Sequence, residues 1–138
     1  MIGVLHTEGD RAEWAFPADP MAVRRARAAV RAQLAAWQLE ELGDVTVLLV
    51  SELVTNSLRY ASGPIGVRLV RVPAPREALL VEVSDPLPDP PLARSAAPDD
   101  EGGRGLQLVA GASRRWGTKP GSAPGGGKTV WFELALPG

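Results

Sequence analysis

The chain has no cysteine and only one histidine, His6, among its 138 residues. Without cysteine there can be no disulfide bond, no thiol nucleophile and no thiolate-ligated metal site. His6 lies too close to the start of the chain for us to expect it in a catalytic triad or a metal site. Thiol chemistry is therefore excluded, and imidazole chemistry is not expected.

Long hydrophobic runs and a strong net charge are also missing. No apolar run approaches the ~20 residues that a membrane-spanning helix needs, and the start of the chain lacks the basic and apolar regions of a signal peptide. The formal net charge of -1 argues against a dedicated nucleic-acid-binding protein. We therefore expect a cytoplasmic protein that contacts neither a membrane nor nucleic acid directly.

Lysine and asparagine are scarce. The chain has thirteen arginines but two lysines and a single asparagine, Asn56. This is the bias that a GC-rich genome produces, so we expect a bacterial source. Asparagine is a mediocre helix former, so its one occurrence inside a predicted helix indicates a chemical role; the alternative is a solvated or capping residue.

The length predicts one domain, because a chain of this size buries very roughly two-thirds of its unfolded surface. Residues 1–10 show no period and are expected to be a flexible lead-in, and residues 11–138 are expected to form the domain. Residues 11–16 alternate as a short strand. Asp19 and Pro20 predict the start of an amphipathic helix of about 18 residues.

Further elements follow at regular spacing. Asp44 predicts the cap of a second, largely buried helix that ends near Ala61. Ile65–Val72 and Ala78–Ser84 are typical of two strands joined by a hairpin. From Pro86 to Glu101 the prolines predict a long loop, such as a lid or binding loop.

The C-terminal part predicts a helix of some ten residues that follows Gly102–Gly105 and ends near Arg115. A short strand over 116–118, a glycine-rich turn over 120–127 and a final strand over 129–136 complete the order. The predicted fold class is α+β, a two-layer sandwich with a mostly antiparallel sheet and its helices on one face.

Glu52 and Asn56 are the polar exceptions in the buried second helix. Residues four apart leave the same helix face, with Cβ atoms roughly 5–6 Å apart. A buried carboxylate and carboxamide need partners, water, metal or ligand. Asn56 can give a neutral oxygen to Mg²⁺, and Glu52 can accept a proton from an attacking hydroxyl or water.

Other polar features fit the same chemistry. Asp85 ends a buried strand and can accept a hydrogen bond from the exocyclic amine of adenine. Gly103-Arg104-Gly105 opens a helix whose N-terminal N–H groups suit phosphates. Lys128-Thr129 resembles the end of a P-loop, but Ser122 replaces the required glycine and a strand follows instead of a helix.

The segment Ser51–Ser57 resembles the N box of the Bergerat-fold ATPases, the superfamily of gyrase, histidine kinases and mismatch-repair ATPases. Its Glu-x-x-x-Asn spacing and the short chain most resemble the anti-sigma factor serine kinases of bacteria. The resemblance runs from Trp14 to Leu136, with three separate boxes in order. It implies a histidine-kinase-like ATPase fold with ATP and Mg²⁺ as cofactors.

The resemblance also implies site roles. Glu52 would be the general base and Asn56 the Mg²⁺ ligand. Asp85 would read adenine with Thr129 close by. The remaining cofactor-binding positions, which would wrap the phosphates under a lid from residues 86–102, are Gly103, Arg104, Gly105 and Leu106.

The implied function is an ATP-binding anti-sigma factor that phosphorylates a STAS-type anti-anti-sigma partner, sequesters a sigma factor and forms a homodimer. One box departs from the family pattern Asp-x-Gly-x-Gly, because the chain has Asp85-Pro86-Leu87-Pro88-Asp89. Proline and leucine cannot take the positive φ angles that glycine allows. Two alternatives therefore stay open: an ATP-gated protein-binding module without catalysis, and an interaction domain that no longer binds nucleotide.

Overall fold

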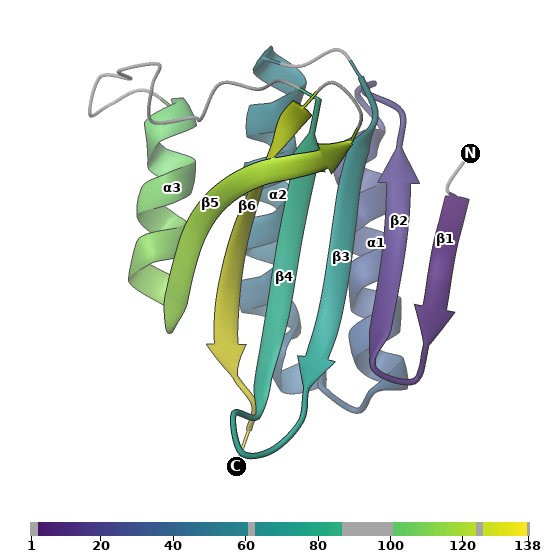
Figure 1. Ribbon diagram of the computed structural model, residues 1–138, viewed down its shortest axis with the longest axis vertical. Coiled ribbons are helices and arrows are strands. Elements are labelled where there is room, and N and C mark those ends of the chain that lie inside the picture. Colours follow the sequence, from purple (N-terminus) through teal and green to yellow (C-terminus); the bar gives the residue numbers. More distant parts are fainter. Residues whose placement is uncertain (1–2, 61–62, 87–100, 124–125, 138) are drawn as a thin grey trace.

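A six-stranded antiparallel sheet forms one layer of the computed structural model, and the helices cover one of its faces (Figure 1). The structure describes residues 3–60, 63–86, 101–123 and 126–137. In spatial order the strands are β1 (Gly3–Glu8), β2 (Arg11–Phe16), β3 (Ile65–Val72), β4 (Ala78–Asp85), β6 (Gly126–Ala135) and β5 (Arg115–Ala123).

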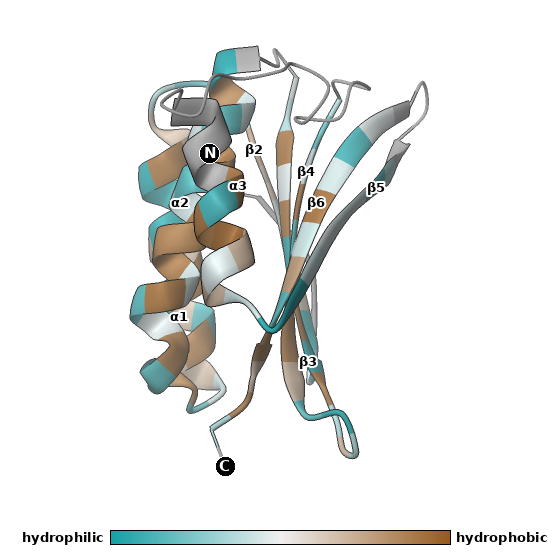
Figure 2. Ribbon diagram, turned by 90° about the vertical axis from the view of Figure 1, so that its left-hand side faces the viewer, coloured by the Kyte–Doolittle hydropathy of each residue, from teal (hydrophilic) through white to brown (hydrophobic). Residues whose placement is uncertain are grey.

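The helical layer holds α1 (Ala22–Ala36), a short 3₁₀ helix η1 (Glu40–Leu42), α2 (Gly43–Tyr60) and α3 (Glu101–Ala112). Figure 2 shows the three α-helices side by side on one side of the sheet. No helix in the described ranges is long and apolar enough to cross a membrane. The predicted α+β sandwich, with an antiparallel sheet and helices on one face, is confirmed.

The core lies between the two layers. Strand residues that face the helices are buried, including Trp14, Val67, Val81 and Phe132. They pack in one cluster with Val30 and Leu34 of α1, Leu49, Val50, Leu53 and Val54 of α2, and Leu106 and Val109 of α3. The alternation of the strands therefore leaves a second, outer face turned away from the helices.

The expectation of a loose lead-in over residues 1–10 is wrong for Gly3–Glu8. This segment is β1, and it pairs antiparallel with β2 at the edge of the sheet. Backbone N–H and C=O groups can pair whatever the side chains are. An edge strand held by backbone pairing can therefore form without a periodic sequence signal.

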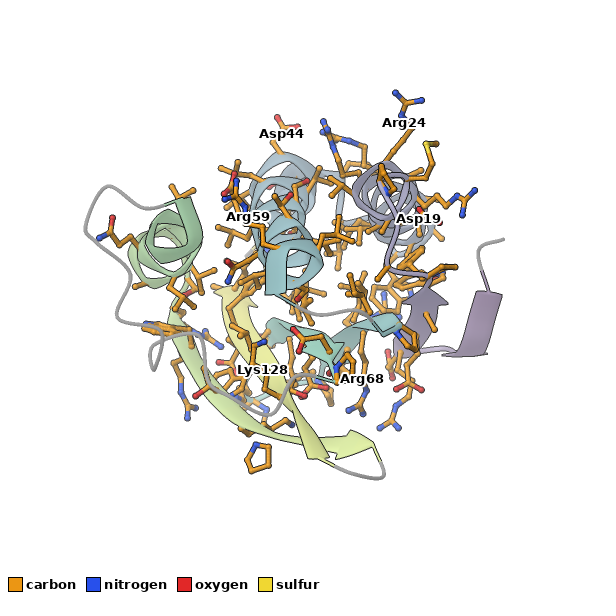
Figure 3. All side chains as sticks on the ribbon, turned by 90° about the horizontal axis from the view of Figure 1, so that it is seen from above. Asp19, Arg24, Asp44, Arg59, Arg68 and Lys128 are labelled. Carbon is orange, nitrogen blue, oxygen red and sulfur yellow. The ribbon has the colours of Figure 1, made fainter. Side chains whose placement is uncertain are left out.

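The helices begin at slightly different residues than predicted. α1 starts at Ala22, and Asp19 Oδ1 accepts a hydrogen bond from the Met21 N–H at 2.8 Å, so Asp19 fixes the turn before the helix instead of capping it. α2 starts at Gly43, directly after η1, so Asp44 lies in its first turn. In Figure 3, Asp44 and Arg24 both point away from the sheet.

The C-terminal elements are longer than predicted. α3 begins at Glu101, so Gly103–Gly105 lie inside its first turns, and it ends at Ala112 instead of near Arg115. β5 and β6 extend the predicted strands and shorten the glycine-rich turn. The predicted loop over Pro86–Glu101 falls almost entirely on residues 87–100, which lie outside the described residues.

β5 curves across the outer face of the sheet (Figure 1). Two buried glutamates of that face each form ion pairs with two basic side chains. Glu82 pairs with Arg68 at 2.9 Å and Lys119 at 2.6 Å. Glu133 is 1% exposed and pairs with Arg114 at 3.2 Å and with Arg76. The outer face is therefore polar, with its buried charges neutralised in the sheet.

Candidate functional site

Asn56 contains a buried acceptor that the protein does not satisfy. The residue is 9% exposed, and its Oδ1 has no hydrogen-bond partner within the described part of the chain. A buried oxygen without a donor costs about 1–3 kcal/mol. A water, a ligand or a cation bound to this oxygen would remove the cost. A carboxamide oxygen is one of the hard ligands that Mg²⁺ takes.

Glu52 lies one helical turn before Asn56 on the same side of α2. Its side chain is half-buried, and no hydrogen bond or ion pair to it is found among the residues that the structure describes. An acidic side chain that is not held by an internal partner remains able to accept a proton from a bound molecule. The predicted pairing of Glu52 and Asn56 on one helix face is therefore consistent with the fold.

Asp85 is the last residue of β4 and lies in a buried polar cluster. Ser57 Oγ donates a hydrogen bond to Asp85 Oδ2 at 2.7 Å. Lys128 Nζ contacts Oδ1 at 3.0 Å and Oδ2 at 2.8 Å. The exposed side-chain fractions are 8% for Lys128 and 2% for Asp85, so this ion pair is almost fully removed from water.

The sheet register explains how these groups meet. Asp85 is directly opposite Lys128, two positions beyond the pair Val83 and Val130. Side chains two residues apart point to the same face, and Val83 and Val130 belong to the core that packs on the helices. Asp85 and Lys128 therefore face α2, where Ser57 lies next to Asn56 in the sequence.

Two glycines allow a close approach around Asp85 and Pro86. Gly127 has φ +104, and a Cβ placed on it would lie 2.6 Å from the carbonyl oxygen of Asp85. A Cβ on Gly63 would lie 2.5 Å from Cγ of Pro86. In the sequence, Leu87 and Asp89 stand where the family pattern Asp-x-Gly-x-Gly has its glycines. Tight packing beside Asp85 and Pro86 still depends on glycine, supplied here by β6 and by the segment after α2.

Thr129 does not join this cluster. Its Oγ1 is 2.8 Å from Ser84 Oγ, and both residues line a hollow of about 370 Å³ on the outer face with Arg68 and Lys119. Because adjacent residues of a strand point to opposite faces, Thr129 faces away from the carboxylate of Asp85. Thr129 is thus one position away from Asp85 in the sheet register, but the residue directly opposite Asp85 is Lys128. The predicted role of Thr129 at the adenine site stays a prediction.

Residues Gly103, Arg104, Gly105 and Leu106 lie in the first half of α3. Leu106 is 5% exposed and packs in the core, and the side chain of Arg104 lies outside the described residues. The first turn of a helix has N–H groups without intrahelical acceptors. Figure 1 shows the start of α3, the end of α2 and the end of β4 at the same upper end of the molecule.

Figure 3 looks down on this end, with Lys128 and Arg59 labelled.

The sequence patterns identified Glu52, Asn56 and Asp85 but not the roles of Ser57 and Lys128. Ser57 follows Asn56 directly, so its position was a usable signal. Lys128 could be linked to Asp85 only with the register of β4 and β6, which hydrophobic alternation alone does not determine.

No group of three or more acidic, histidine or cysteine residues that could hold a metal is found in the described ranges. Mg²⁺ does not require one, since it is commonly bound through one or two protein ligands, phosphates and waters. Asn56, with its unsatisfied oxygen, is the residue here that fits such a role.

Comparison with known proteins identifies a family for this chain. The family model of the histidine kinase-like ATPase domain matches residues 16–133, most of the 138-residue chain. Among curated proteins no significant match is found. The matched range includes α2, β4, α3 and the start of β6, and hence every group described above.

Proposed function

The chain belongs to the histidine kinase-like ATPase domain family, an ATP-binding module of the GHKL type, and we propose that it acts as a serine/threonine protein kinase. The proposed substrate is a hydroxyl group of a STAS-type anti-anti-sigma protein. As an anti-sigma regulator the protein would also sequester a sigma factor, act as a homodimer and work in a bacterial cytoplasm.

The observation that carries this proposal is the unsatisfied Oδ1 of Asn56, one turn from Glu52. Asn56 would hold Mg²⁺, which would neutralise charge on the triphosphate when bound. N–H groups in the first turn of α3 would hold phosphate oxygens. Asp85 would accept a hydrogen bond from the adenine amine, and the core packing of β4 and β6 would fix its position.

Glu52 would act as the base. As the substrate hydroxyl oxygen forms its bond to the γ-phosphorus, the bond from that phosphorus to the β–γ bridging oxygen breaks and ADP leaves. The hydroxyl proton passes to the carboxylate of Glu52. The half-buried side chain supports this role, because it is open to a bound substrate without being held by a partner in the described chain.

A second candidate is an ATP-gated protein-binding module without catalysis. It is favoured by the engagement of Asp85 with Lys128 and Ser57, and by Leu87 and Asp89 where the family pattern has glycine. Both features would alter the surroundings of the bound adenine, and neither involves Glu52. Under this alternative, ATP would bind and change the partner surface, but no phosphoryl group would be transferred.

The test is a transfer assay with the purified chain, γ-labelled ATP, Mg²⁺ and a STAS protein encoded near it. We expect label on a serine or threonine of the STAS protein, and a loss of at least about 100-fold in the rate for Glu52→Gln, as for removal of a general base. Glu41→Gln, which alters an exposed acid of η1, is the control and should keep the wild-type rate.

Two results separate the candidates. Label transfer that is the same in Glu52→Gln and wild type would contradict the base role. ATP binding by calorimetry, with neither labelled partner nor ADP formed over hours, would favour the module without catalysis.

A further inference from the structure

Lys128 is the only buried cation among the residues whose burial the structure describes. Placing an ammonium group in the interior is costly unless its charge and its hydrogens are satisfied. The proposed transfer chemistry gives Lys128 no task, since the phosphates would lie at α3 and the metal at Asn56. Its burial beside Asp85 therefore needs another explanation.

The contacts leave Lys128 with donor capacity. An ammonium carries three hydrogens. Within the described chain Asp85 is its one partner, through contacts of 3.0 and 2.8 Å to the two carboxylate oxygens. Ser57 donates to the same carboxylate at 2.7 Å and so holds its orientation from the helix side. At least one hydrogen of Lys128 is then available to a molecule that also contacts Asp85.

If Asp85 contacts adenine as in the proposed function, a second residue is placed to recognise the same base. We propose that Lys128 donates a hydrogen bond to the ring nitrogen N1 of adenine while Asp85 accepts one from the exocyclic amine. The exocyclic amine of an adenine bound to Asp85 would lie next to Lys128, because the amine and the Lys128 ammonium would contact the same carboxylate. In adenine the amine is attached to the carbon beside N1, so a carboxylate next to an ammonium matches the donor and acceptor order of that edge.

The position of Lys128 is fixed by the fold. It lies opposite Asp85 in the register of β4 and β6 and follows Gly127, whose positive φ and close contact with the Asp85 carbonyl allow the two strands to meet there. The other lysine of the chain, Lys119, points to the outer face, where it pairs with Glu82 at 2.6 Å. Lys119 is therefore a matched control for Lys128.

The first test uses the wild-type protein and nucleotide analogues. Calorimetry with Mg²⁺ would compare ATP, 1-deaza-ATP, in which a C–H replaces N1, and 7-deaza-ATP, in which N1 is kept. We expect 1-deaza-ATP to bind at least about tenfold more weakly than ATP, since a hydrogen bond from a charged donor is lost. The affinity of 7-deaza-ATP should stay within about twofold of that of ATP.

Other results would distinguish a failure of the Lys128 role from a failure of the proposed function. If ATP binds and 1-deaza-ATP binds equally well, the role of Lys128 is overturned while the proposed function stands. GTP that binds as tightly as ATP would also overturn it, because guanine has a carbonyl in place of the amine and an N–H at N1, the reverse of the order that Asp85 and Lys128 would read. If no nucleotide binds, the proposed function falls and this inference with it.

The second test adds variants. In Lys128→Met the affinity ratio of ATP to 1-deaza-ATP should fall toward one, while Lys119→Met should keep the wild-type ratio. An unchanged ratio in Lys128→Met would overturn the proposal. The analogue series in the wild-type protein decides the question if Lys128→Met does not fold.

Discussion

At the scale of single residues, Glu133 is the most deeply buried charge of the outer face. Its side chain is 1% exposed, and both of its partners, Arg76 and Arg114, are partly exposed. Removing a buried partner leaves charges that the folded protein solvates poorly. Because the arginines keep access to water, the cost should lie at the lower end of the range for buried ion pairs.

We expect Glu133→Ala to lower the free energy of unfolding by about 3 kcal/mol. Urea titration followed by circular dichroism measures it. Glu41→Ala, at an exposed acid of η1, should change the stability by less than about 0.5 kcal/mol. Equal effects of the two substitutions would contradict the structural role of the Glu133 ion pairs.

Some of the candidate site residues could be predicted from local sequence patterns and others could not. Glu52 and Asn56 were predictable because helix periodicity alone places residues four apart on one face. Asp85 was predictable as a carboxylate at the end of a hydrophobic strand. The contact of Lys128 with Asp85 was not predictable, because it depends on the register of β6 against β4, two strands that are not consecutive in the chain.

At the scale of elements, two glycines offer opposite predictions. Gly111 lies in α3, and a Cβ on it would meet no atom within 4 Å. Gly111→Ala should therefore raise the free energy of unfolding by about 0.5–1 kcal/mol through helix propensity. A loss of stability in thermal or urea unfolding would contradict the assignment of residues 101–112 as a helix with an open face at Gly111.

Gly127→Ala should have the opposite effect. The residue has φ +104, and its new Cβ would lie 2.6 Å from the Asp85 carbonyl oxygen. A strained backbone conformation costs of order 1–3 kcal/mol, and the forced shift would also disturb the pairing of Asp85 with Lys128. We expect lower stability and weaker ATP binding; a neutral result in both measurements would contradict the close approach of β6 to β4.

The elements themselves divide by how local their signals are. β3 and β4 were predicted almost to the residue, because alternating hydrophobic residues stand between clear turn signals. β5 was predicted too short, because Pro120 and its neighbouring glycines usually end a strand. β5 lies at the edge of the sheet, where a proline is tolerated since no donor is required on its free side.

At the scale of the whole molecule, the two layers share one core, and Phe132 lies fully buried within it. Phe132→Ala should lower the free energy of unfolding by about 3–5 kcal/mol, the range for large-to-small changes in a core. Urea unfolding monitored by tryptophan fluorescence and by circular dichroism should show one coincident transition. Two separate transitions would contradict a single cooperative core.

The layered architecture was predictable, since buried helices and half-buried strands have one economical arrangement. The strand order β1-β2-β3-β4-β6-β5 was not predicted. It places β6 between β4 and β5, and this insertion is what brings Lys128 to Asp85. Non-local pairings of this kind depend on the packing of the whole sheet, which no local pattern specifies.

The most direct test of the account is a paired measurement on Asn56→Leu. Its Oδ1 is buried without a partner in the described chain, so replacement by an apolar side chain of similar size should not lower the stability of the ligand-free protein by more than about 1 kcal/mol. If Asn56 holds Mg²⁺, the same substitution should weaken Mg²⁺-dependent ATP binding at least about tenfold, measured by calorimetry with and without Mg²⁺. A stable variant that binds ATP with Mg²⁺ as tightly as the wild type would contradict the placement of the nucleotide at this site.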